Sequence, residues 1–243
     1  MCTRSLITHR VSELKVQIEL PRFVQPEKIE IDANERAVSK KSQYCFFVCT
    51  TFDSFLNDFL IFDDVNLLVE TVRKKDDEIG LCKTVAGFSW DWKTKQKNKP
   101  KDDMSCYDLL VQNGEYDILI ENHKYIWNLT NESWVTRQDS HCTIGCIHTT
   151  QGYDMNYVGV IFGKEIDYDF NSNSIVIDLE NYKDSKVKAG TDKETLKELI
   201  INTYTTILAR GIKGCYVYAY NKNMQKYLKK FIIPANEVTL EEK

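Results

Sequence analysis

Residues 147–154 combine side chains that could contact a phosphate and a sugar. They read Ile-His-Thr-Thr-Gln-Gly-Tyr-Asp. A hydroxyl-rich turn with a glycine can direct backbone N–H groups at a phosphate, and the Asp154 carboxylate can accept a hydrogen bond from a ribose hydroxyl. Ligands of parallel α/β sheets bind in the crevice at the strand ends. This turn is therefore the leading candidate site.

A second candidate segment ends in Arg210, which is followed by Gly211 and Gly214. The permanent charge and forked donors of a guanidinium match a γ-phosphate. We expect the two glycines to release the backbone, so that Arg210 can reach across a cleft. The alternative is an arginine that offsets a helix dipole, with Gly211 as the C′ residue.

The elements that must position these segments follow from hydrophobic spacing. Apolar residues recur at helical spacing over 191–209, with Thr191 or Asp192 as N-cap, and over 63–77, before Gly80. A short helix is expected at 222–231. Strands are expected at 81–88, 117–120, 143–148, 157–162, 174–179 and 215–220. This alternation predicts an α/β fold with a mainly parallel central sheet flanked by helices, preceded by an irregular N-terminal segment.

The composition predicts a folded globule without a global positive field. The chain has 243 residues, of which 42% are hydrophobic and 28% charged, and its net charge is −4. Binding to nucleic acid would therefore need a local basic patch. The best candidate is 93–103, with five lysines, which is either a solvated linker or a contact to phosphates. Trp90 and Trp92 precede it and suit either base stacking or core packing.

The sequence also bears on location and on metal chemistry. No apolar run approaches the roughly 20 residues of a membrane helix, and residues 1–20 do not form a secretory signal, so we expect a cytoplasmic protein without a membrane contact. The eight cysteines are then best read as reduced thiols. Cys142, Cys146 and His148 could form a zinc site, and Cys146 with His148 could form a nucleophile pair. Buried thiols are the preferred interpretation, and no metal site is predicted.

Several motifs in a fixed order resemble the schlafen-like family of predicted DNA/RNA helicases, which are of the superfamily-one type. The matching segments are 85–92, 127–128, 145–154, 157–163 and 210–218. The resemblance covers roughly residues 60–232, and the two candidate segments correspond to motifs V and VI. It implies a RecA-like fold, the second such half of a P-loop motor. The expected domain spans 61–233, after an irregular segment at 1–60 and before a polar tail at 234–243.

The resemblance also implies roles for individual residues. Arg210 would be the arginine finger that stabilises charge on the transferring phosphoryl group. Gln151, Gly152 and Asp154 would line the nucleotide cleft, with Thr149 and Thr150 near a phosphate. The implied ligands are ATP with Mg, in a complete two-half motor only, and DNA or RNA. Asp154 is one methylene shorter than the usual Glu of the family.

One expected motif is missing from the sequence. No segment reads Gly-x-x-x-x-Gly-Lys-Ser/Thr, the loop that holds the β- and γ-phosphates. Residues 175–180 superficially resemble a Walker B strand but come after motif V, so we read them as structural. We therefore expect no ATP hydrolysis by this chain alone, and activity only with an upstream polypeptide that carries the missing loop. The alternative is a degenerate scaffold module that keeps the fold without catalysis.

Overall fold

A computed structural model describes residues 58–95, 103–129 and 133–237. The predictions for residues 1–57, for most of the lysine-rich loop and for residues 238–243 lie outside this part of the chain. The domain limits given above therefore stay predictions.

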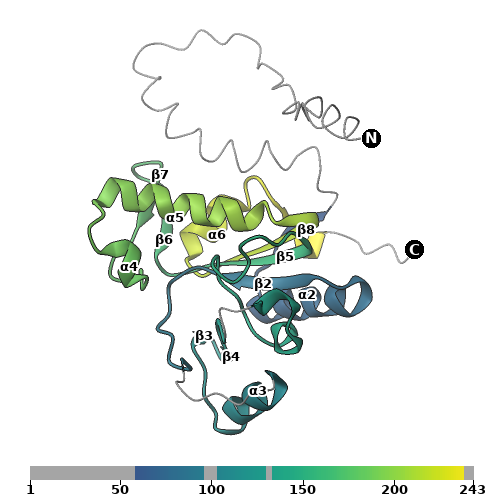
Figure 1. Cartoon of the computed structure of the whole chain (residues 1–243). Coiled ribbons are helices and arrows are strands. Elements are labelled where there is room, and N and C mark those ends of the chain that lie inside the picture. Colours follow the sequence, from purple (N-terminus) through teal and green to yellow (C-terminus); the bar gives the residue numbers. More distant parts are fainter. Residues whose placement is uncertain (1–57, 96–102, 130–132, 238–243) are drawn as a thin grey trace, which may run out of the picture. The chain divides into compact units, whose positions relative to one another are not determined.

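The fold is built on a parallel five-stranded sheet with the order β2-β5-β8-β1-β9 (Figure 1). Its strands are β1 (Asp58–Ile61), β2 (Cys82–Ala86), β5 (Met155–Phe162), β8 (Gly211–Ala219) and β9 (Ile233–Pro234). All four pairings, β2 with β5, β5 with β8, β8 with β1 and β1 with β9, are parallel. This arrangement confirms the predicted α/β, RecA-like fold class.

Helices cover both faces of this sheet. In Figure 1, α2 (Val65–Ile79) lies on one side, and α5 (Lys193–Leu208) and α6 (Lys222–Leu228) lie on the other. Side chains of a strand alternate between the two faces. Accordingly, Tyr216 of β8 packs in the cluster under α2, and Val217 packs in the cluster under α5.

The longest helix, α5, forms for the reasons that its sequence indicates. The carboxylate of Asp192 accepts hydrogen bonds from the backbone N–H groups of Glu194 and Thr195, each at 3.1 Å, and so caps the helix. Leu196, Ile200 and Ile207 then recur on one face and are buried. The predicted helix and its cap are confirmed.

Smaller elements fill the connections. They are α3 (Asp103–Gln112), the β3 (Ile118–Ile120) and β4 (His123–Tyr125) hairpin, 3₁₀ turns at Trp134–Thr136, Gln138–His141 and Ala235–Glu237, the β6 (Ile166–Asp169) and β7 (Ser174–Ile177) hairpin, and α4 (Ser185–Lys188). Within the described residues, no helix combines the length and the apolar character needed to cross a membrane.

One predicted strand, at 143–148, is wrong, and another, at 174–179, forms outside the central sheet. Residues 143–148 contribute only single parallel bridges, from Ile144 and Gly145, before the chain turns. Residues 174–179 contain β7, which pairs with β6 in an antiparallel hairpin outside the central sheet. Ile175 packs against the core whereas Val176 is exposed, so this apolar run has only one buried face.

Candidate functional site

Arg210 and Asp154 lie side by side because each precedes the first residue of a neighbouring parallel strand. Met155 opens β5 and pairs with Gly211, which opens β8. The backbone N–H of Met155 donates to the carbonyl oxygen of Arg210 at 2.8 Å. The strand register therefore fixes both candidate residues at the end of the sheet where β5 and β8 begin, which we call the amino edge.

The two side chains form an exposed ion pair. Arg210 Nη1 lies 3.3 Å from Asp154 Oδ1, and the side chains are 25% and 64% exposed. Such a pair contributes at most about 1 kcal/mol to stability. A guanidinium has several N–H donors in a fixed fork, and this contact uses one of them. Arg210 can therefore bind an incoming anion at little cost.

A bulge at the start of β8 interrupts the strand pairing at the amino edge. Between the pairs Met155–Gly211 and Tyr157–Gly214, β8 contains one residue more than β5, and Ile212 within it is exposed. A Cβ at Gly214 would come 2.2 Å from the ring of Tyr157, and one at Gly211 would come 2.3 Å from the carbonyl oxygen of Gly214.

These contacts correct the expectation that the glycines release the backbone. Gly211 and Gly214 lie inside β8, where close packing requires them. The φ of Gly211 is not in the left-handed region, so it is not a left-handed C′ residue either.

Thr149 and Thr150 are buried and hold the turn that leads to Asp154. Thr149 Oγ1 accepts from the Cys146 N–H at 2.8 Å and donates to the Cys146 carbonyl at 2.9 Å. Thr150 Oγ1 lies 3.2 Å from the Ile147 carbonyl oxygen. Their burial and these bonds argue against direct contact with a phosphate.

Gln151 and Gly152 occupy the exposed part of the same turn. Gly152 has a φ of +84°, which glycine adopts without strain. Of the candidate residues, the structure thus brings Asp154 and Arg210 into contact, exposes Gln151 and Gly152 on the turn before Asp154, and buries the two threonines.

The candidate site does not lie in the crevice that we expected from the strand ends. The expected strand at 143–148 does not form, and the turn leads into the beginning of β5 at the amino edge. The carboxyl ends of the strands instead border two cavities, of about 470 and 680 Å³, which share Tyr220 and Asn221.

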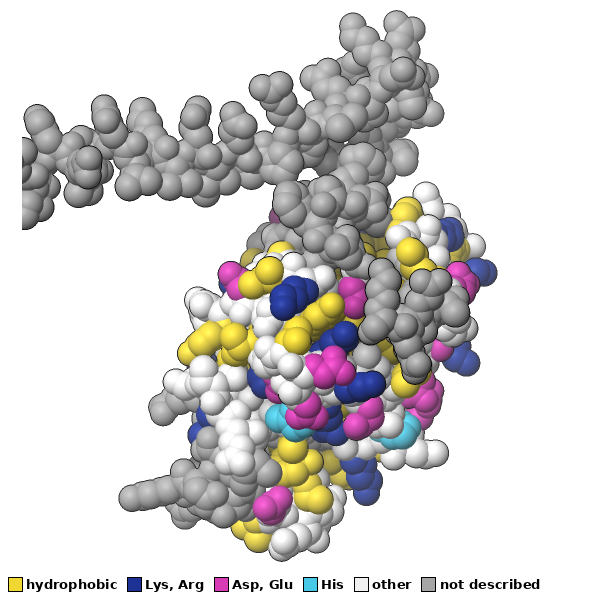
Figure 2. Space-filling view, turned by 90° about the vertical axis from the view of Figure 1, so that its right-hand side faces the viewer, with side chains coloured by type: hydrophobic (Ala, Val, Ile, Leu, Met, Phe, Trp, Pro, Cys, Tyr) yellow, Lys and Arg dark blue, Asp and Glu magenta, His cyan; other side chains and the backbone are white. Residues whose placement is uncertain are grey.

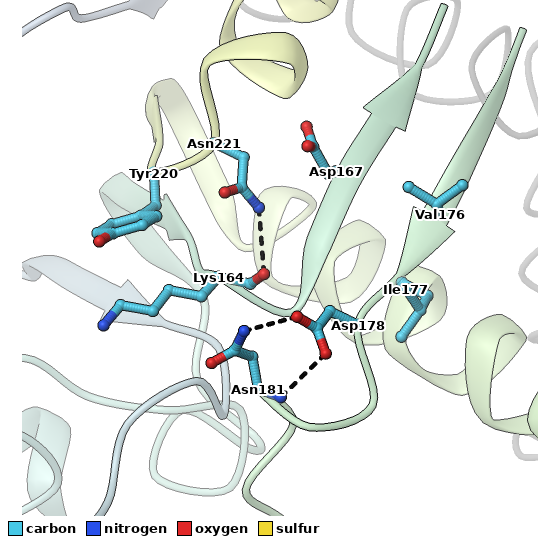
Figure 3. A pocket seen from close by; sticks show the side chains of 8 residues that line it. All are labelled: Lys164, Asp167, Val176, Ile177, Asp178, Asn181, Tyr220 and Asn221. Carbon is cyan, nitrogen blue, oxygen red and sulfur yellow. Dashed lines mark hydrogen bonds between the residues drawn. The ribbon is translucent and has the colours of Figure 1, made fainter. Parts of the chain in front are cut away.

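The smaller of these cavities is lined by polar groups that already bond to the protein (Figure 3). The side-chain amide of Asn221 donates to the Lys164 carbonyl at 3.1 Å, and that of Asn181 donates to Asp178 at 2.7 Å. The Asn181 hydrogen bond lowers the pKa of Asp178. These polar groups therefore serve to hold the cavity wall together. The amino edge, where Arg210 has only one weak partner, is the better candidate for function.

A buried carboxyl group that sequence reasoning missed supports the helix before Arg210. Glu165 is 1% exposed and accepts hydrogen bonds from Ser89 and from the Tyr204 hydroxyl, the latter at 2.5 Å. Burial raises its pKa. Tyr204 also accepts from the Gly163 N–H at 2.9 Å, which ties α5 to the end of β5. A glutamate just after a buried strand is the only signal of this network in the sequence.

The Cys146 thiol and the His148 imidazole, considered above as an alternative nucleophile pair, have different partners. Cys146 is fully buried, and its Sγ lies 3.3 Å from Asn128 Oδ1, whereas His148 Nε2 lies 3.6 Å from Asp184. Burial raises the pKa of Cys146, which opposes thiolate formation. The described residues hold no group of three His, Cys, Asp or Glu side chains arranged for a metal.

Charges of both signs are mixed over the face of the molecule on the right of Figure 1. Figure 2 looks onto that face and shows acidic and basic side chains interspersed, with hydrophobic side chains between them. Such a surface produces no single-sign field over that face.

Comparison with known proteins gives one family and one relative. Residues 48–221 match the model of the Schlafen group 3, DNA/RNA helicase domain. An uncharacterised protein of Saccharomyces cerevisiae is 30% identical over 176 residues, which cover 70% of this chain and 36% of the relative, so the chain spans about a third of that protein's length. No solved structure matches. Because the family model covers most of the chain, the chain belongs to the Schlafen group 3 DNA/RNA helicase domain family.

Proposed function

We propose that this chain acts as the second RecA-like lobe of a nucleic-acid-dependent ATPase of the helicase type. Family membership supports a helicase-related function, with nucleotide and nucleic-acid binding, in general terms. One observation supports the more specific proposal of a second lobe that acts on ATP. The pairing of β5 with β8 holds the Arg210 guanidinium beside Asp154 at an exposed edge. In this proposal the amino edge faces a nucleotide that is bound to a companion lobe.

Arg210 would stabilise the negative charge that develops on the transferring phosphoryl group. Its position is set by the end of α5 and the start of β8, so little order is lost when it binds. The weak pair with Asp154 orients the guanidinium in the absence of nucleotide and gives way to a phosphate oxygen at small cost.

The turn before β5 would bind the rest of the nucleotide. Asp154 is the more exposed partner of the ion pair, and its carboxylate can accept a hydrogen bond from a ribose hydroxyl. Gln151 and the backbone of Gly152 are exposed beside it and can donate to a phosphate or a ribose. Thr149 and Thr150 would act only by holding this turn in shape.

The companion lobe would supply the phosphate-binding loop, because the sequence contains no Gly-x-x-x-x-Gly-Lys-Ser/Thr segment. When bound there, Mg would neutralise charge between the β- and γ-phosphates. The residues of this chain would then complete the site from the opposite side.

The test is an ATPase assay on the full chain mixed with a polypeptide that carries such a loop and is encoded beside it. We expect activity that single-stranded nucleic acid stimulates and that neither polypeptide shows alone. Arg210→Ala should reduce kcat by about 10³-fold or more, as for other arginine fingers. Arg210→Lys should restore little, because an ammonium lacks the planar fork.

Lys213→Ala is the matched control, since Lys213 is an exposed cation in the same bulge. It should leave kcat within about twofold, a change worth under about 0.5 kcal/mol. An inert mixture, or equal losses in the Arg210 and Lys213 variants, would contradict the proposal, and an inert mixture would favour the scaffold module.

A further inference from the structure

Three lysines and two aromatic rings gather on the insertion between β2 and β5. Lys93 Nζ and Lys124 Nζ lie 5.0 and 4.9 Å from the centroid of the Tyr116 ring. Lys95 Nζ lies 5.1 Å from the ring of Trp92. We call these five residues the lysine–aromatic patch. They come from two separate stretches of chain, so their meeting depends on the fold.

A buried carboxylate builds the patch. Asp117 accepts hydrogen bonds from the backbone N–H and the hydroxyl of Thr94, at 2.8 and 2.7 Å, and from the Trp127 N–H at 2.8 Å. Both Asp117 and Thr94 are buried. Lys93 and Lys95 flank the anchored Thr94, so their Cα atoms are at most about 7 Å apart. Their backbone is fixed before any ligand arrives.

The charges of the patch are available to a ligand. All three lysines are exposed, and none forms an ion pair with a carboxylate of the described residues. By contrast, Lys83 and Lys229 each contact an aspartate at 2.6 Å. Trp92 and Tyr116 are half-buried, so part of each residue remains at the surface, and an ammonium group lies beside each ring.

We propose that the lysine–aromatic patch binds single-stranded nucleic acid without ATP. Ammonium groups held in place attract phosphates, and aromatic rings at the surface stack on unpaired bases. A duplex offers the same phosphates but keeps its bases stacked inside, so the rings favour a single strand. This proposal rests on the proposed function only in that the bound strand would be the one on which the motor acts. Binding at the patch needs neither nucleotide nor Arg210, so the binding proposal and the ATPase proposal can fail independently.

The first experiment measures how salt affects binding of the full chain to a fluorescein-labelled oligo(dT) or oligo(U) strand, by anisotropy without ATP. Each phosphate contact on a single strand contributes about 0.7 to the slope of log K against log[salt]. The triple variant Lys93→Gln, Lys95→Gln, Lys124→Gln should therefore lower the magnitude of the slope by about 2 and weaken binding by roughly tenfold or more. Loss with either strand supports the proposal.

A matched triple variant on α6 and the turn that follows it controls for net charge. Lys222→Gln, Lys226→Gln and Lys230→Gln remove three exposed lysines, and two of these also lie over an aromatic ring, that of Phe170, at 5.2 and 4.9 Å. This variant should keep the wild-type affinity and slope. An equal loss in both triple variants would overturn the proposal, because charge alone would then explain binding.

The second experiment separates stacking from charge. Tyr116→Ala and Trp92→Ala should each weaken single-strand binding by roughly five- to hundredfold while the salt slope stays the same. Tyr116→Phe and Trp92→Phe keep a ring and should bind like the wild type, and thermal unfolding of the two alanine variants checks that their fold is intact. A duplex of equal length that binds as tightly as the single strand, with the same losses, would overturn the assignment to unpaired bases.

Discussion

Arg210 and Glu165 are both ionisable residues at strand ends, yet their surroundings give them opposite properties. Arg210 is partly exposed and has one weak partner, so it can exchange that partner for a ligand. Glu165 is buried and accepts bonds from two hydroxyl groups, so its role is to hold structure. Exposure and partners, more than residue type, decide which charged side chain is available for chemistry.

The buried state of Glu165 predicts a dependence of stability on pH. Burial raises its pKa in the folded state, so the folded protein holds this proton more tightly than the unfolded chain. Its contribution to stability is fully present below the unfolded pKa of about 4.3 and is lost as pH rises through the raised folded pKa. The loss amounts to about 1.4 kcal/mol for each unit by which the pKa is raised.

Glu165→Gln, which mimics the protonated form, should remove this dependence. The difference in unfolding free energy between the variant and the wild type, measured with urea, should shift in favour of the variant as pH rises from about 5 to 8. Asp63→Asn should give a flat difference over this range, because the hydrogen bond from Lys229 lowers the pKa of Asp63 and its linked change in stability occurs below about pH 4. A flat difference for the Glu165 variant would mean that the carboxyl is not buried as described.

At the scale of elements, the bulge of β8 makes a second prediction. A Cβ at Gly214 would contact the Tyr157 ring at 2.2 Å and the Asp58 carbonyl oxygen at 2.8 Å, so the strands must shift to accept it. Gly214→Ala should lower the unfolding free energy by about 1–3 kcal/mol, as for other overpacked sites. Urea unfolding with an unchanged m-value would measure this.

Gly114→Ala is a suitable comparison, because nothing lies within 4 Å of a Cβ there and only its φ of +69° opposes the change. The left-handed backbone alone costs about 1–2 kcal/mol. If combining Gly214→Ala with Tyr157→Ala recovers no stability, the clash with the ring is not the cause of the loss.

Local patterns predicted the elements whose signals lie within one segment. The capped, periodic α5 and the apolar run of β5 are examples. The prediction failed at 143–148, because the residue pattern does not show how long a segment stays paired, and here Gly145 bridges the edge strand β2 at one residue before the chain turns. The meeting of Arg210 with Asp154 depends on the register of β5 and β8, and the meeting of Tyr116 with Lys93 depends on the fold of an insertion. Neither contact has a signature at one place in the sequence.

At the scale of the whole molecule, the amino edge combines its charged pair with exposed apolar side chains. Ile212 is 61% exposed and Leu81 is 47% exposed. Both lie near Asn156. The N–H of Asn156 donates to the Leu81 carbonyl at 2.8 Å, and Asn156 lies opposite the bulge that contains Ile212. Apolar residues beside a proposed nucleotide site suit contact with a companion lobe.

Ile212→Asp should therefore weaken association with the companion polypeptide by roughly tenfold or more without lowering stability. Isothermal titration calorimetry would measure the affinity, and thermal unfolding would check the fold. Leu67→Asp on α2 is the control, since Leu67 is also exposed, at 56%. It lies at the start of α2, whereas Leu81 of the amino edge follows the other end of that helix. Equal weakening by both variants would contradict a contact specific to the amino edge.

The position of β1 has a consequence for how the protein is made. Its hydrogen-bonding neighbours are β8 and β9, and Gly214, which pairs with Asp58, comes 156 positions later in the chain. While the ribosome is still translating, β1 therefore emerges long before either neighbour, with both of its sides unpaired. Until β8 has left the exit tunnel, the unpaired edges of β1 can pair with a wrong strand of this or another chain. We therefore expect chaperones to bind this segment during that interval.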